Sequence, residues 1–132
     1  MKLSVSQVKV QIDALIRESV TALSPGASLG ASLGDFTSVP CNDNNGSDLS
    51  GPVEVARSYF INGLEAANND AYFDNFIQYW KGRGWHMHDD SRPRDPFLSM
   101  ENNDGFGLAL EATVDTGRIS ISGSSPCVKP DK

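Results

Sequence analysis

Two histidines separated by one residue form the most chemically specific group in this sequence. His86 and His88 are the chain's two histidines, and Asp89 and Asp90 follow them directly. A strand would place both imidazoles on one face, where an H-x-H pair with a carboxylate as third ligand could bind Zn²⁺. The other interpretation is a solvent-facing strand that ends in an acidic turn. Because no third ligand motif is found elsewhere, we expect a metal-free strand and keep a small metal-dependent enzyme as the alternative.

The two cysteines predict a structural bond. Cys41 and Cys127 belong to no CxxC or Cys/His metal-binding spacing. They lie toward the two ends of one predicted domain, which is the usual layout of a structural disulfide. Closing a loop of roughly 86 residues would stabilise the fold by about 4 to 5 kcal/mol in the chain-entropy model. Because disulfides persist in oxidising compartments, we expect an exported protein. The alternative is two buried thiols in a cytosolic protein.

Large aromatic side chains are concentrated between residues 72 and 85: Tyr72, Phe73, Phe76, Tyr79, Trp80 and Trp85. Helical spacing predicts a stripe that faces a sheet, made of Phe73, Phe76, Ile77 and Trp80. Tyr72 and Tyr79 are predicted to share a more exposed face. Since the aromatics cover more than one face, some are expected to contact a protein or a ligand. The candidates for this contact are Tyr72, Tyr79, Trp80 and Trp85.

Two further groups have weaker chemical signals. Oxygen ligands for Ca²⁺ are offered by Asp43, Asn45, Ser47 and Asp48, although Gly46 is misplaced for an EF-hand loop. Asn45-Gly46-Ser47 also matches an N-glycosylation acceptor. A Pro-interrupted loop mixes Arg83, Arg92 and Arg94 with Asp89, Asp90 and Asp95. We interpret it as a solvated turn, with a binding rim as the alternative.

Composition narrows the function classes. The chain has 132 residues, which favours one domain, and a net charge of −6, which would repel a phosphate backbone. We therefore expect no nucleic-acid binding. No apolar stretch approaches the ~20 residues of a membrane span. The sequence also lacks a nucleophile elbow, a P-loop and a dinucleotide-binding fingerprint, so we expect neither catalysis nor a cofactor.

The N-terminal part is predicted to form a helix over residues 6–23. Its apolar residues follow the three-and-four spacing of one buried stripe: Val5, Val8, Ile12, Leu15, Ile16, Val20 and Leu23. Ser4 and Gln7 fit a capping box, and Ser24-Pro25-Gly26 ends the helix. Residues 24–35, in which Ala-Ser-Leu-Gly occurs twice, are interpreted as a Gly/Ser-rich connecting loop.

The remaining pattern predicts an α+β body over residues 36–128. Residues 36–41 favour a short strand, residues 42–48 a polar loop, and residues 53–61 a strand, although a helix over 53–64 also fits. A second helix follows the capping candidates Asn68-Asn69-Asp70 and ends at Gly82 and Gly84. Period-two strands come next, with hairpin turns at residues 103–105 and 115–117. The expected fold is a single domain, residues 1–132, with an antiparallel sheet of about five or six strands, two helices on one face and one disulfide.

Several short segments resemble a known family. They are Gly82-Arg83-Gly84-Trp85, Asp104-Gly105-Phe106, Ile119-Ser120-Ile121 and Ser124-Ser125-Pro126-Cys127-Val128. In layout the chain is similar to small secreted or lipid-anchored proteins of actinobacteria, such as the mycobacterial LppA-like lipoproteins. The resemblance implies a location in the cell envelope. It departs from the family because the chain shows no export signal and no lipid-accepting cysteine.

These observations favour a non-catalytic, extracytoplasmic interaction or ligand-binding domain, secreted or in the cell envelope. The expected partner is another envelope or secreted protein, with possible membrane anchoring through a removed N-terminal lipoprotein segment, and the expected state is a monomer. The alternatives are the metal-dependent enzyme and an acidic immunity or inhibitor protein, because acidic surfaces can neutralise basic sites.

Overall fold

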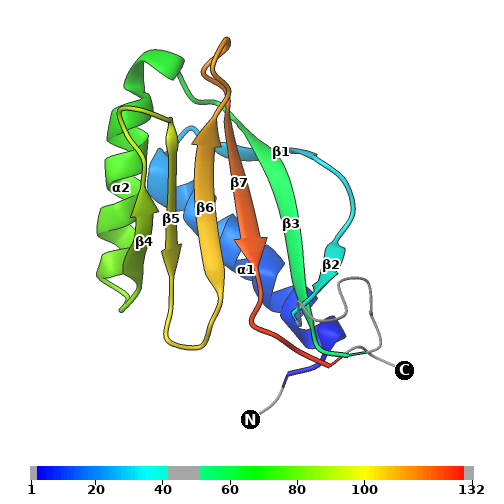
Figure 1. Ribbon diagram of the computed structural model, residues 1–132. Coiled ribbons are helices and arrows are strands. Elements are labelled where there is room, and N and C mark those ends of the chain that lie inside the picture. The colour runs from blue at the N-terminus through cyan, green and yellow to red at the C-terminus, as the bar shows by residue number, and fades with distance from the viewer. Residues whose placement is uncertain (1–2, 42–50, 130–132) are drawn as a thin grey trace.

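The computed structural model describes residues 3–41 and 51–129. Within these ranges the chain forms two α-helices, one short 3₁₀ turn and seven strands of a single sheet (Figure 1). In chain order the elements are α1 (Val5–Leu23), β1 (Ser28–Ser32), β2 (Thr37–Pro40), β3 (Val53–Asn62), the 3₁₀ turn (Ala66–Asn68), α2 (Asn69–Lys81), β4 (His86–Asp90), β5 (Phe97–Glu101), β6 (Gly107–Ala112) and β7 (Ile119–Ser124). The predicted α+β class is confirmed.

The first helix is built as its sequence predicts. The Ser4 hydroxyl accepts from the Gln7 N–H at 3.2 Å, and the Gln7 side-chain oxygen accepts from the Ser4 N–H at 2.8 Å. This capping box pairs two backbone donors that a helix start leaves free. The apolar stripe is buried against the sheet: Val8, Ile12, Leu15, Ile16, Val20 and Leu23.

The sheet is antiparallel throughout, and its strand order is β1, β3, β7, β6, β5, β4. β2 pairs with β3 beside β1, so the two short strands pair with different halves of the long one. Residues 53–62 form a strand, which resolves the strand-or-helix ambiguity. Both helices lie on one face of this sheet, as predicted, and no helix formed by residues 3–41 and 51–129 covers the other face (Figure 1).

The sheet has seven strands instead of the five or six expected, because one strand forms where the sequence predicted a loop. Residues 28–32 pair with the end of β3, aligning Ser28 with Asn62 and Leu29 with Ile61. Gly30 permits this approach, since a Cβ there would lie 2.8 Å from the Phe60 carbonyl oxygen. The glycine content that suggests a loop is thus what lets the backbone pair closely.

The second helix buries more of its surface than its spacing predicts. Phe73, Phe76 and Trp80 are buried as expected. Tyr72, predicted to be exposed, retains 8% of its surface, and its hydroxyl accepts from the Glu65 N–H at 3.1 Å. The exposed assignment is wrong because the segment before the helix folds back over this side.

The start of α2 also differs from the expectation. Asn68 occupies the N-cap position but makes no side-chain capping bond. The neighbouring Asn69 instead donates from Nδ2 to the Gly117 carbonyl oxygen at 2.8 Å, which ties the helix to the β6–β7 turn. Its side chain therefore holds a tertiary contact in place of a local cap.

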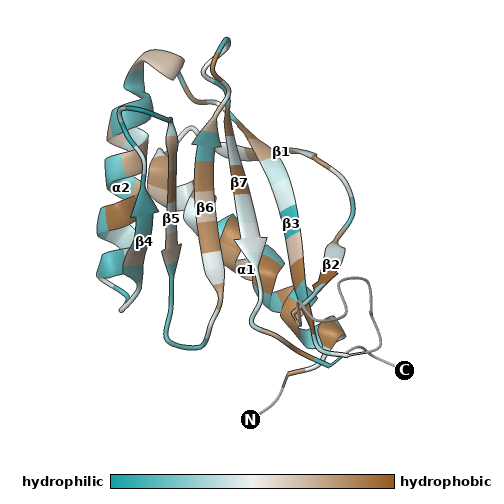
Figure 2. Ribbon diagram, in the orientation of Figure 1, coloured by the Kyte–Doolittle hydropathy of each residue, from teal (hydrophilic) through white to brown (hydrophobic). Residues whose placement is uncertain are grey.

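The last four strands form an antiparallel meander, one strand more than the three consecutive strands that the two hairpin turns predict. In Figure 2, β5 and β6 alternate brown and paler segments, whereas the edge strand β4 is mostly teal. The hairpin turns contain Gly105 and Gly117 with φ of +92° and +72°, a conformation that glycine adopts without strain. The two predicted hairpins are confirmed.

A disulfide joins Cys41 to Cys127, with Cα atoms 6.2 Å apart, and confirms the predicted pairing. Cys41 directly follows β2, and Cys127 lies just beyond β7, beside the backbone pair formed by Val53 and Val128. In the described parts of the chain, no helix is both long and apolar enough to cross a membrane.

Candidate functional site

The aromatic residues predicted to contact a partner lie mostly in the core. Tyr72, Trp80 and Trp85 are buried. The indole N–H of Trp80 donates to the Ser19 hydroxyl at 3.0 Å, and the Trp85 ring packs 4.8 Å from that of Trp80. These contacts join α2 to α1 and to the start of β4, so the three side chains hold the helical layer together and offer little area to a partner.

Tyr79, the fourth candidate, is half-buried between neighbours of its own chain. Its hydroxyl donates to the Glu18 carboxylate, and this hydrogen bond raises the tyrosine pKa. The Arg83 guanidinium lies 4.5 Å from the ring centroid and 3.2 Å from the same carboxylate. The group pins α2 to α1 and leaves little of Tyr79 for recognition.

The histidines lie on β4 as predicted, with exposed side chains. The Nε2 atom of His86 is 3.5 Å from a Glu101 carboxylate oxygen, and the Nδ1 atom of His88 is 3.2 Å from the Ser99 hydroxyl. Asp89 accepts from the Ser91 hydroxyl at 2.8 Å. No group of three His, Cys, Asp or Glu in residues 3–41 and 51–129 is placed to hold a metal ion.

The Arg/Asp loop is more ordered than a solvated turn. The Arg92 guanidinium, with 18% of its side chain exposed, binds Asp90 at 3.0 Å, Asp74 at 3.1 Å and Asp70 at 3.3 Å. This guanidinium lowers the pKa of the Asp90 carboxyl. Arg83 and Arg94 take no part, since they pair with Glu18 and Asp95. The cluster clamps the β4–β5 loop onto α2.

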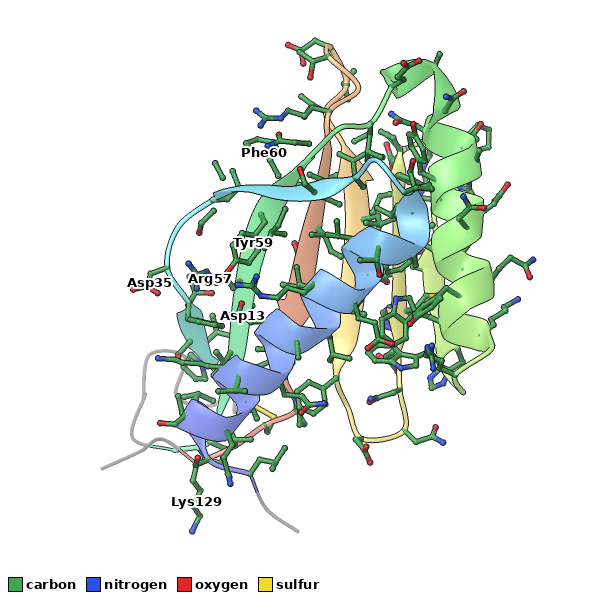
Figure 3. The ribbon with its side chains drawn as sticks, turned by 180° about the vertical axis from the view of Figure 1, so that it is seen from behind. Asp13, Asp35, Arg57, Tyr59, Phe60 and Lys129 are labelled. Carbon is green, nitrogen blue, oxygen red and sulfur yellow. A yellow bond between two sulfur atoms is a disulfide. The ribbon has the colours of Figure 1, made fainter. Side chains whose placement is uncertain are left out.

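A second charged group lies inside the helical layer and was missed from the sequence. Arg57 lies between the Phe36 and Tyr59 rings, 4.8 and 4.9 Å from their centroids, and approaches Asp13 of α1 at 3.9 Å (Figure 3). The Tyr59 hydroxyl donates to Asp13 at 3.1 Å, and burial and this bond raise the tyrosine pKa. Arg57 shares a strand face with the buried residues Val55 and Tyr59, so its inward direction follows from the period-two alternation of β3.

The predicted Ca²⁺ ligands and the N-glycosylation acceptor lie in residues 42–50, outside the described residues. A hollow of about 710 Å³ is lined in part by Leu3, Pro52 and Lys129. A hollow of about 430 Å³ next to α2 is lined by the clamp residue Arg92 and by prolines of the same loop.

The surface opposite the helices, which we call the open face, has an unusual composition. Strand register aligns its outward side chains in rows across the sheet. The middle row is Ser58, Ser122, Ala109 and Ser99. The row toward the disulfide end is Ala56, Ser124, Gly107, Glu101 and His86, and the row toward the opposite end is Phe60, Ser120, Glu111 and Phe97. In the first two rows, the residues contributed by β3, β7 and β6 all have small side chains, whereas solvated sheet faces usually carry longer polar ones.

The small rows form a shallow depression of about 240 Å³. Its wall includes His88 and Glu101, and its lining includes the side chains of Ser99, Ser122 and Ser124. At Gly107 a Cβ would lie 2.8 Å from the Ser124 hydroxyl, so the surface there is backbone. The clue available in the sequence was that every outward residue of β7 is serine, at 120, 122 and 124.

Comparison with known proteins identifies no relative of this chain. No family model matches the chain, and neither the curated proteins nor the solved structures include a match. The open face, the two histidines at its edge and the disulfide are therefore the features from which a function can be proposed.

Proposed function

We propose that this protein is a non-catalytic binding domain that acts outside the cytoplasm and binds its partner through the open face. One observation carries the proposal. The sheet is covered by helices on one face, whereas the other presents rows of Ser, Ala and Gly across β3, β7, β6 and β5. Small side chains let a second surface approach the strands closely and lose little rotamer entropy on contact.

The shape of the open face favours binding over catalysis. Ligand pockets of enzymes are usually concave and bury most of a small molecule, whereas the depression here is shallow and about 240 Å³. The imidazoles at its edge face single neighbours, His86 beside Glu101 and His88 beside Ser99. A broad, flat surface of this kind suits a protein partner.

The extracytoplasmic location rests on the disulfide. A bond between Cys41 and Cys127 persists where the compartment is oxidising. The resemblance to LppA-like lipoproteins supports the same location, and with it a secreted form or anchoring through an N-terminal lipid-bearing segment. Both the family assignment and the anchoring are part of the proposal.

A site-resolved crosslinking experiment tests the binding face. The photoreactive residue p-benzoylphenylalanine would replace Ser122, at the centre of the open face, or Thr21, exposed on α1. After irradiation in the organism that encodes the chain, we expect a crosslinked partner from position 122 and not from position 21. Excess unlabelled wild-type protein should suppress the crosslink, because both forms compete for one partner.

Crosslinks from position 21 and not from position 122 would move the binding surface to the helical layer and overturn the proposal. So would an absence of crosslinks from both positions. Thermal unfolding of each variant before irradiation controls for misfolding.

A further inference from the structure

We propose that the partner of the open face is a basic protein surface, and that a Lys or Arg side chain of this partner enters the depression beside Glu101. The inference rests on the proposed function and adds the chemical character of the partner. It follows from the charges around the small rows, from the groups that line the depression, and from the repulsion expected between the open faces of two copies of the chain.

The open face has carboxylates that no lysine or arginine of the described chain neutralises; Glu101 has the His86 imidazole as its neighbour, with Nε2 at 3.5 Å. Glu54, Glu101 and Glu111 lie on β3, β5 and β6, and within residues 3–41 and 51–129 no Lys or Arg pairs with any of them. Arg118 lies 3.8 Å over the Phe60 ring of this face and donates to Asn62 at 3.3 Å. It is therefore held at the end of the sheet away from Glu101.

The helical side shows the opposite arrangement. Three arginines there are matched with carboxylates: Arg83 with Glu18, Arg57 with Asp13, and Arg92 with Asp70, Asp74 and Asp90. The glutamates of the open face have no such guanidinium partner, so we expect this face of the −6 chain to be acidic. Complementary potentials steer association and select a partner of opposite charge.

The depression offers acceptors to a cationic side chain. Glu101 supplies a carboxylate at its wall, and Ser99, Ser122 and Ser124 supply hydroxyl oxygens in its lining. A guanidinium has five N–H donors and an ammonium three, and neither has an acceptor, so both need a set of oxygen acceptors of this kind. The Ser122 hydroxyl already lies 2.7 Å from that of Ser58, which holds its oxygen in place.

A second copy of this chain is a poor occupant for the same reason. A two-fold interface places the same patch on both partners, so three glutamates without a lysine or arginine partner would meet the same three on the other copy. Like charges brought together across an interface cost several kcal/mol. Nucleic acids and anionic membrane surfaces are repelled by the same carboxylates.

The test uses a nona-arginine peptide as probe and a nona-glutamate peptide as its counterpart. Binding would be measured by fluorescence anisotropy at about 50 mM salt, and the site by amide shifts in NMR. We expect nona-arginine to shift amides of β5, β6 and β7 and nona-glutamate to shift none. Glu101→Gln should weaken the binding of nona-arginine about two- to fivefold. Glu54→Gln should act in the same direction.

The matched control is Asp115→Asn, which removes the same charge from the exposed β6–β7 turn. Its affinity for nona-arginine should equal that of the wild type. If Asp115→Asn weakens binding as much as Glu101→Gln, the attraction is diffuse and the proposed site is overturned. Shifts confined to the helical side, or no binding at all, would also overturn it.

The two proposals fail separately. A partner crosslinked through position 122, with an affinity that neither Glu101→Gln nor added salt changes, would keep the open face as the binding surface and overturn the basic partner. A lack of crosslinks at that position would overturn both. Glu101 has 44% of its side chain exposed, so its replacement should leave folding intact, which thermal unfolding verifies.

Discussion

At the scale of single residues, Arg92 forms ion pairs with three aspartates and thereby links the β4–β5 loop to α2. Its guanidinium bonds carboxylates from α2 and from its own loop, and its charged end lies 5.3 Å from the Phe73 ring centroid. Hydrogen bonds to charged groups contribute about 1.5 to 3 kcal/mol each when sheltered, and less when exposed. Asp70 and Asp74 are largely exposed, so the Asp90 bond is expected to contribute most.

Replacing this arginine should leave three aspartates close together without a cation. Arg92→Met, which keeps most of the side-chain volume, is expected to lower the free energy of unfolding by about 1 to 3 kcal/mol. Arg92→Lys should recover only part of the loss, because an ammonium cannot match the planar fork of donors. Urea denaturation measures both variants, and a lysine variant as stable as the wild type would contradict the bridging role.

The same substitution should change the pH dependence of stability. Arg92 lowers the pKa of Asp90 in the folded state, so this carboxylate adds stability above its unfolded pKa of about 3.9 and loses it as the pH falls through the lower folded value. The stability difference between wild type and Arg92→Met should therefore shrink as the pH falls from about 5 to 3. A constant difference over this range would show that the loss comes from packing.

At the scale of elements, α1 approaches the sheet closely at Gly123 of β7. A Cβ at this position would lie 2.9 Å from the Ile12 Cγ2 atom and 3.3 Å from the Ile16 side chain. The glycine therefore lets α1 pack directly on the strand, and a larger side chain would force the two elements apart.

Gly123→Val is expected to lower the free energy of unfolding by about 1 to 3 kcal/mol through overpacking. The control is Ser120→Val on the same strand, whose side chain points to the open face and should change stability by about 0.5 kcal/mol or less. Urea denaturation compares the two. Equal losses would mean that valine disturbs the strand itself and that the contact with α1 is not the cause.

The elements also show what could be predicted from the sequence. The first helix and the two C-terminal hairpins have strong local periodicity and local turn or cap residues, and these predictions are confirmed. β1 depends on the free edge of β3, and the burial of Tyr72 depends on the backbone of Glu65. The first contact is distant in sequence and the second depends on the path of the turn before α2, so neither leaves a periodic trace, and both were assigned incorrectly.

The open face illustrates the same limit for the candidate site. Its small residues come from β3, β5, β6 and β7, and within single segments only the alternating serines of β7 hint at them. The rows exist only when register aligns the strands. The aromatic cluster, in contrast, is conspicuous in the sequence because it is local, and the structure uses most of it for the core.

At the scale of the whole molecule, the disulfide closes the fold at one end of the sheet. Cys41 and Cys127 are 86 positions apart in the sequence. Backbone bonds already join the same region, from the Cys41 N–H to the Pro52 carbonyl at 3.0 Å and between Val53 and Val128 at 2.8 Å in both directions. The covalent bond thus connects segments that the sheet positions independently, and its main effect should be on the unfolded chain.

The double variant Cys41→Ser/Cys127→Ser should therefore keep its fold and lose stability. For a loop of this length the chain-entropy model gives a loss of about 4.5 kcal/mol, close to the whole stability of a marginal small domain. We expect an unchanged circular dichroism spectrum and a urea midpoint lowered by about 2 M or more. Reductant should move the wild-type midpoint to the same value and leave the variant unaffected. A variant as stable as the oxidised wild type would contradict this effect, because it would mean that the disulfide does not raise the free energy of the unfolded chain relative to the native state.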